Sequence, residues 1–205
     1  NLNSDLSVTS TTTLTDGTLT LGAYSLTIYN LSTGSGNINA INSGSTLIFS
    51  NNTAITLPAF LTNINNLTIN GTGGLTASSD MTVNGVLNLA AANPSATKGS
   101  LDMGSYTLNM GVSSTTTGTG DVEGIVKREH TFAIETIYTF GSQYTTFYFV
   151  DANTKPQWII CKITIGAIPV WGTLGGWDTV RGKVSRYYNV AVSNNSSTSV
   201  AAINM

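Results

Sequence analysis

The chain is poor in charge, in cysteine and in histidine. Only 9% of its 205 residues are charged and the formal net charge is −2, whereas an ordinary soluble domain carries roughly 25% charged residues. Without a basic surface there is no electrostatic basis for binding nucleic acid, so we expect no nucleic-acid partner. Cys161 has no second cysteine for an internal disulfide, and together with the single His130 it is too little for a zinc cluster.

Long apolar runs and leader-like features are also missing. No apolar stretch approaches the roughly 20 residues of a membrane-spanning helix, so we expect no membrane insertion. The start, Asn1-Leu2-Asn3-Ser4, has neither the basic nor the apolar segment of a signal peptide. A surface of hydroxyl and amide side chains with few lysines favours an extracellular or cell-surface protein whose targeting segment has been removed over a cytosolic protein.

Small polar residues take the place of charge. Threonine, serine, asparagine and glycine together make up 97 of the 205 residues. Apolar residues nevertheless account for 40% of the chain and recur throughout it. A disordered low-complexity chain is therefore excluded, because the sequence has enough apolar surface to form a core.

Charge is distributed unevenly along the chain. Residues 1–120 contain one cation, Lys98, and four carboxylates, whereas residues 121–205 contain seven cations, six carboxylates and all three tryptophans. This change in composition predicts two domains, 1–120 and 121–205.

The first of these domains repeats itself. Residues 17–28 match residues 99–110 at an offset of 82, with five of twelve positions identical, and residues 33–41 match 117–125. A shorter echo consists of apolar–polar–apolar triplets, which occur at residues 26–28, 67–69, 81–83 and 108–110.

Each triplet has a period of two, which indicates a short strand with one buried face. Glycine and asparagine between the triplets supply corners, since both tolerate left-handed backbone angles. These features predict a parallel β-helix (solenoid) of about 20 residues per turn, so that the 82-residue offset would be about four turns. Threonine and asparagine on outward columns would form hydrogen-bonded ladders between turns. An antiparallel sandwich of duplicated hairpins is the alternative, but two-residue hairpin turns are scarce.

After residue 120 the segments are longer, aromatic and β-branched, as is typical of a small β-sandwich. We therefore predict an all-β protein in which an N-terminal solenoid is followed by a β-sandwich, with no helix of any length. The strands of the second domain are expected within residues 124–130, 135–140, 144–150, 157–165 and 181–192.

Few residues suggest chemistry. Asp80 and Asp102 are 22 residues apart and would fall on adjacent turns, close enough for the carboxylate pair of a polysaccharide-degrading enzyme. Aspartates that cap corners explain them better. The charged residues 121–130 are interpreted as a solvated strand. Cys161 alternates with Ile159 and Ile163 and is expected in the core. We predict no catalytic residue, no metal site and no cofactor.

Trp171 and Trp177 offer a different possibility. Exposed tryptophans form platforms on which sugar rings stack, although such residues more often belong to a core. They make a cell-surface adhesin or carbohydrate-binding module, with surface glycans as partners, the alternative function.

Several motifs resemble repetitive secreted surface proteins of Bacteroidota. They are the Gly-x-Leu-x-Leu-Gly-x-Tyr-x-Leu turn, the Asn66-Leu-Thr-Ile-Asn-Gly71 and Met81-Thr-Val-Asn-Gly85 steps, and the exit Gly120-Asp-Val-Glu-Gly-Ile-Val-Lys127. The resemblance implies export by a type IX secretion system and a role in adhesins, surface layers or fibres, without catalytic residues. It also implies O-glycosylation of Thr179, because Asp178-Thr179-Val180 matches the acceptor pattern of that phylum.

The leading hypothesis is a structural subunit of an extracellular filament. The first and last turns of a solenoid have unpaired backbone groups, which must be capped or paired with another chain. Copies of the same chain would then join head to tail. The candidate residues for this joint are Leu2, Leu6 and Val8 on one side and Val190, Val192, Val200 and Ile203 on the other.

Overall fold

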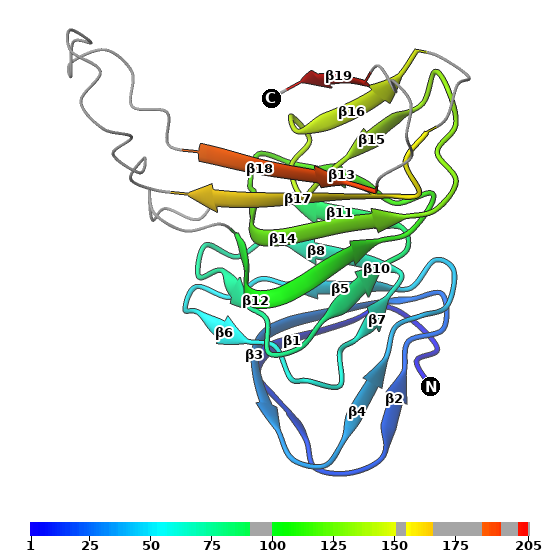
Figure 1. Cartoon of the computed structure of the whole chain (residues 1–205). Coiled ribbons are helices and arrows are strands. Elements are labelled where there is room, and N and C mark those ends of the chain that lie inside the picture. The colour runs from blue at the N-terminus through cyan, green and yellow to red at the C-terminus, as the bar shows by residue number, and fades with distance from the viewer. Residues whose placement is uncertain (91–99, 151–154, 166–185, 194–200, 205) are drawn as a thin grey trace, which may run out of the picture.

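The computed structural model describes residues 1–90, 100–150, 155–165, 186–193 and 201–204. In these residues every regular element is a β-strand, and the strands form a coil with sheets on two faces (Figure 1). The face at the back, sheet 1, has six strands in chain order: β1 (Leu6–Leu14), β3 (Ser25–Thr33), β5 (Thr46–Phe49), β8 (Asn66–Ile69), β11 (Val86–Leu89) and β13 (Thr115–Thr117).

The face at the front, sheet 2, contains the parallel strands that alternate with those of sheet 1 (Figure 1). An isolated bridge between Ala40 and Ile64 continues this face to a two-stranded sheet, β2 (Thr18–Thr20) and β4 (Asn37–Asn39). The parallel strands of sheet 2 are β6 (Ile55–Thr56), β7 (Asn63–Ile64), β9 (Leu75–Thr76), β10 (Met81–Val83), β12 (Leu101–Met110) and β14 (Val122–Glu129).

Sheet 1 is stacked in register, which confirms the solenoid. One column runs through Leu6, Leu26, Leu47, Leu67 and Leu87, whose successive members are 20, 21, 20 and 20 residues apart. All pairs in this sheet are parallel. The antiparallel sandwich of hairpins is therefore wrong for this part of the chain, and the expected turn length of about 20 residues is confirmed.

Alternation within each triplet forms the core. Leu26 and Ile28 have no exposed surface, and neither do Leu67 and Ile69, whereas the threonine between each pair faces outward. Burying one such aliphatic side chain contributes about 1.5–3 kcal/mol. Repetition of this pattern on every turn gives a narrow but continuous hydrophobic core.

The outward polar side chains form the expected ladders between turns. The Asn30 amide donates to the Thr11 hydroxyl over 3.1 Å, and the Asn84 amide donates to the Asn63 side-chain oxygen over 2.6 Å. Such contacts join neighbouring turns without charge, which explains how the chain forms a surface with few ionised groups.

The 82-residue repeat does not correspond to four whole turns. The residue four turns above Leu26 in the sheet 1 column is Thr116. Leu108, which follows Leu26 by 82 positions, lies instead in sheet 2, where its register partner is Met81. The two copies instead share a corner, in which Gly22 and Gly104 have φ angles of 63° and 55°. The repeat thus marks a local strand–glycine–strand bend that the solenoid uses on different faces.

Parallel stacking continues past residue 120. β14 pairs in parallel with β12, so the last solenoid turn includes residues that the change in composition placed in a second domain. β17 (Trp158–Ile165) and β18 (Arg186–Val192) then extend sheet 2 as antiparallel strands. A separate cap sheet consists of β15 (Ile137–Thr139), β16 (Thr146–Phe149) and β19 (Ala201–Asn204).

The cap sheet and the extension of sheet 2 share one core. Phe147 and Phe149 of β16 and Ile159 of β17 are at most 2% exposed and belong to the same hydrophobic cluster as the solenoid. Cys161 is fully buried among them, as the alternation predicted. The predicted all-β fold class, an N-terminal parallel solenoid followed by a small β-sandwich, is confirmed, although one layer of the second region, sheet 2, is a direct continuation of the solenoid.

Corners of successive turns are in close contact. Asn51 is fully buried, and its amide donates to the carbonyl oxygens of Thr53 (2.7 Å) and Gly74 (2.9 Å), the latter on the next turn. Gly71 lies so near that a Cβ atom there would be 2.0 Å from the Asn51 carbonyl oxygen. Glycine is therefore required at Gly71 by space, and Asn51 joins two corners.

We predict that Asn51→Ala lowers the free energy of unfolding by about 1–3 kcal/mol, since the buried carbonyl group of Gly74 and the part-buried one of Thr53 lose their donor. The neighbouring Asn52 is exposed, so Asn52→Ala is the matched control and should change this value by less than about 0.5 kcal/mol. Urea-induced unfolding followed by circular dichroism measures both. Equal destabilisation by the two variants would contradict the assigned role of Asn51.

Candidate assembly sites at the ends of the solenoid

β1 is the outermost strand of sheet 1 at the N-terminal end, the lower end in Figure 1. Leu6 and Val8 lie opposite Leu26 and Ile28 in register, so they are on the core face of the sheet. Leu6 is nevertheless 40% exposed, because none of the described strands pairs with the other side of β1. The N-terminal end therefore presents core-type side chains that are only half covered.

Leu2, another residue expected in the joint, is engaged within the chain. Its backbone N–H donates to the carbonyl of Thr20 over 2.9 Å, and its side chain packs partly against the core cluster. The Asp5 carboxylate likewise accepts from the backbone N–H of Ser25 over 2.7 Å. The first residues thus begin the first turn and hold β1 in position.

β18 is the outermost strand of sheet 2 at the opposite end. Val190 and Val192 lie opposite Cys161 and Ile159 of β17, both of which are buried, so the two valines are also on a core face. They are 36% and 48% exposed. As at β1, none of the described strands pairs with the outer side of β18. Its core-facing valines are therefore only partly covered.

At this same end, sheet 1 is covered. The last strand, β13, carries the buried Thr116, whose backbone N–H donates to the Thr139 hydroxyl of β15 over 2.7 Å. Figure 1 shows the cap sheet lying over β13. Both faces thus end in a strand with one unpaired side, but at β13 the cap sheet covers that side, whereas none of the described strands pairs with the outer side of β18.

Arg128 fastens the cap sheet to the solenoid. It has no exposed surface, and its guanidinium donates to three backbone carbonyl oxygens: that of Thr139 from Nε (3.0 Å), that of Gly111 from Nη1 (2.8 Å) and that of Ser114 from Nη2 (2.5 Å). It also lies 5.5 Å from the ring centroid of Tyr138. Burial lowers the pKa of Arg128 to about 10, so the side chain remains charged at neutral pH.

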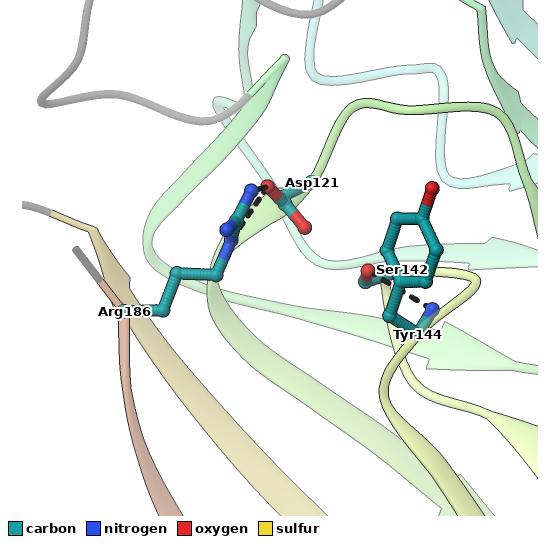
Figure 2. A network of polar contacts seen from close by, with 4 residues as sticks. All are labelled: Asp121, Ser142, Tyr144 and Arg186. Atoms are coloured by element: carbon teal, nitrogen blue, oxygen red, sulfur yellow. Dashed lines mark hydrogen bonds and ion pairs between the residues drawn. The ribbon is translucent and has the colours of Figure 1, made fainter. Parts of the chain in front are cut away.

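A partly buried ion pair attaches β18 to the last turn. Figure 2 shows Arg186 of β18 reaching Asp121, which is 6% exposed; Nε and Nη2 both donate to Asp121 Oδ2, the former over 2.9 Å. The hydrogen bond to Asp121 raises the pKa of Arg186. In the same view, the Ser142 hydroxyl accepts from the backbone N–H of Tyr144 over 3.3 Å.

Interpreting residues 121–130 as a solvated strand was thus wrong for Asp121 and Arg128. Alternation correctly placed Arg128 and Lys127 on opposite faces of the strand. It did not predict that Arg128 is on the buried face, because a charged side chain does not indicate a core position. Lys127 and Glu129 behave as expected and form a surface ion pair.

The carboxylates considered for catalysis serve as corner caps, as their sequence context predicted. Asp80 Oδ1 accepts from the backbone N–H of Thr107 and Asp102 Oδ1 accepts from that of Gly104, both over 2.8 Å. The register partner of Asp102 on the preceding turn is Thr76 and not Asp80. In the described part of the chain, no group of three or more potential metal ligands comes together.

Several predicted site residues lie outside the described residues: Trp171, Trp177, Thr179 and Val200. Ile203 is within β19, and its backbone pairs with Phe147 of the same chain. One side of that strand is therefore already used within the molecule.

No family model, no curated protein and no solved structure matches this chain. In the residues described, no helix has the length and apolar character needed to cross a membrane. The fold defines the chain as an all-β protein, a parallel solenoid with antiparallel sheets at one end.

We predict that Arg128→Met lowers the free energy of unfolding by about 3 kcal/mol or more, because three carbonyl groups then lose a charged donor inside the protein. Lys127→Met is the matched control on the next residue; it removes only a surface ion pair and should cost less than about 1 kcal/mol. Urea-induced unfolding distinguishes the two variants, and similar values for both would contradict the role of Arg128 in fastening the cap sheet to the solenoid.

Proposed function

We propose that this protein is a non-enzymatic structural subunit of an extracellular filament or surface fibre, which assembles head to tail from copies of itself. The observation that carries the proposal is that both outermost strands expose residues of a core face: Leu6 and Val8 at one end, Val190 and Val192 at the other. A further strand at either end would continue the same pattern of burial.

The outermost strands also lack the usual protection. Natural sheet edges are kept from pairing by prolines, by charged side chains or by covering elements. Residues 6–14 contain no proline and no charged residue, although a register shift interrupts β1 between Val8 and Thr11. In β18 the only charged residue is Arg186, which is paired with Asp121. Strand addition is the interaction that such edges favour.

The two ends differ in structure, which supports a head-to-tail contact over a symmetric one. A joint between unlike surfaces is heterologous and repeats without closing when no rotation closes a ring. The composition, rich in threonine and asparagine and low in lysine, supports an extracellular or cell-surface location. Export by type IX secretion and O-glycosylation of Thr179 belong to the same proposal.

The alternatives receive less support. A glycan-binding role depends on Trp171 and Trp177, which lie outside the described residues. An enzymatic role depends on Asp80 and Asp102, and each of these carboxylates caps a corner.

We expect the purified protein to form uniform fibres in electron micrographs, and Val8→Lys or Val190→Lys to abolish or shorten them at least tenfold. A lysine on the core face of either outer strand would place an unpaired charge in the joint. Ser7→Lys and Asn189→Lys are matched controls, because these exposed neighbours point to the opposite face, and they should leave fibre length unchanged.

Circular dichroism on each variant checks that the monomer remains folded. A wild-type protein that stays monomeric at all concentrations in analytical ultracentrifugation would refute the filament. Fibres of normal length from both core-face variants would refute strand addition through these faces.

A further inference from the structure

We infer that the joint between copies is a parallel pairing of β1 on β18, which connects sheet 1 of one copy to sheet 2 of the next. This inference rests on the proposed filament and specifies its contact. It follows from three features of the described residues: which face is sealed, which side chains face the core, and in which direction β18 runs.

The sealed face excludes the simplest stack, in which sheet 1 of one copy would continue as sheet 1 of the next. The far end of sheet 1 is occupied by the cap sheet, which Thr116 and Arg128 bind through Thr139. Arg128 also binds the turn before β13 through the carbonyls of Gly111 and Ser114. The incoming β1 therefore meets the other face, sheet 2.

The outer strand of sheet 2 has the side chains to receive β1. Tyr188, Val190 and Val192 alternate along one face of β18, opposite the buried Ile163, Cys161 and Ile159. Leu6 and Val8 have the same spacing of two along β1. Pairing the two strands would cover both exposed sets and continue the hydrogen-bonded ladder, and neither strand contains a proline that would remove a donor.

The direction of the pairing follows from topology. β18 is antiparallel to β17, which is antiparallel to β14, and β14 is parallel to β12. β18 therefore runs around the coil in the same sense as the parallel turns. Rotation about the coil axis does not change this sense, so every copy in a head-to-tail stack presents β1 parallel to the β18 below it.

Symmetric contacts would have the opposite geometry. Two copies that meet at identical ends are related by a two-fold axis, which makes β1 antiparallel to β1, or β18 antiparallel to β18. Parallel pairing is thus the signature of a polar fibre. Because each joint passes from sheet 1 to sheet 2, which lie on different faces, successive copies are also rotated about the fibre axis and the fibre is helical.

Disulfide cross-linking in assembled fibres tests this inference. The double variants place one cysteine at Leu6 or Val8 and the other at Tyr188, Val190 or Val192, and non-reducing gels measure the ladder of covalent multimers after mild oxidation. The native Cys161 is buried and its burial raises the pKa of the thiol to about 12, so it should not react. Ser7→Cys with Val190→Cys is the control, because Ser7 faces the opposite side.

In the parallel arrangement, moving the first cysteine from position 6 to position 8 moves its best partner two residues toward the C-terminal end of β18. We expect at least fivefold more multimer from that partner than from the control. A shift of the best partner in the opposite direction, or dimers that form from a single cysteine at position 6 or 8, would overturn the parallel joint while leaving the filament intact.

Two further results would be decisive. Fibres without any cross-link between these strands would also overturn the inference alone. Failure of the wild-type protein to form fibres would refute the proposed function, and the joint with it.

Discussion

Parallel in-register stacking is the constraint on which the rest of this structure depends. Each strand in the coil needs a neighbour on both sides, for its backbone hydrogen bonds and for the cover of its core-facing side chains. Between the ends this need is met about every 20 residues by the next turn, as the column from Leu6 to Leu87 shows. The first and last turns lack one neighbour. Unpaired backbone groups and uncovered core-facing side chains are therefore expected at the ends of the coil and not in its middle.

At the far end, the last strands of the two sheets are covered differently. Over sheet 1 the chain folds back as a cap sheet, and the buried Arg128 donates to carbonyl groups of both the last corner and the cap sheet. Over sheet 2 the chain adds β17 and β18, which move the outer edge two strands further without closing it. A protein that needed only a stable monomer would gain from covering both faces. The half-sealed end and the uncovered β1 are the features on which the proposed self-association rests.

Local patterns predicted much of the fold. The triplets at 26–28 and 67–69 became strands with one buried face because alternation in a strand is set by backbone geometry alone. β15, β16, β17 and β18 fell within the predicted segments for the same reason, whereas β14 begins two residues before its segment and β19 was not predicted. The meaning of the 82-residue repeat was not recoverable in this way, since a repeated strand–glycine–strand bend fits any corner of a coil. Only the pairing of Leu108 with Met81 shows that the second strands of the two copies, 25–28 and 107–110, lie on different faces.

The sequence by itself determined the strand class, the length of a turn and the polar, weakly charged surface, because these depend on periodicity and composition within a few tens of residues. The tertiary structure alone decided which strands are outermost, which end is sealed and that Arg128 and Asp121 are buried. Those properties arise from contacts between segments far apart in the chain, such as Asp121 with Arg186, 65 residues away. The residues adjacent in sequence do not predict such contacts.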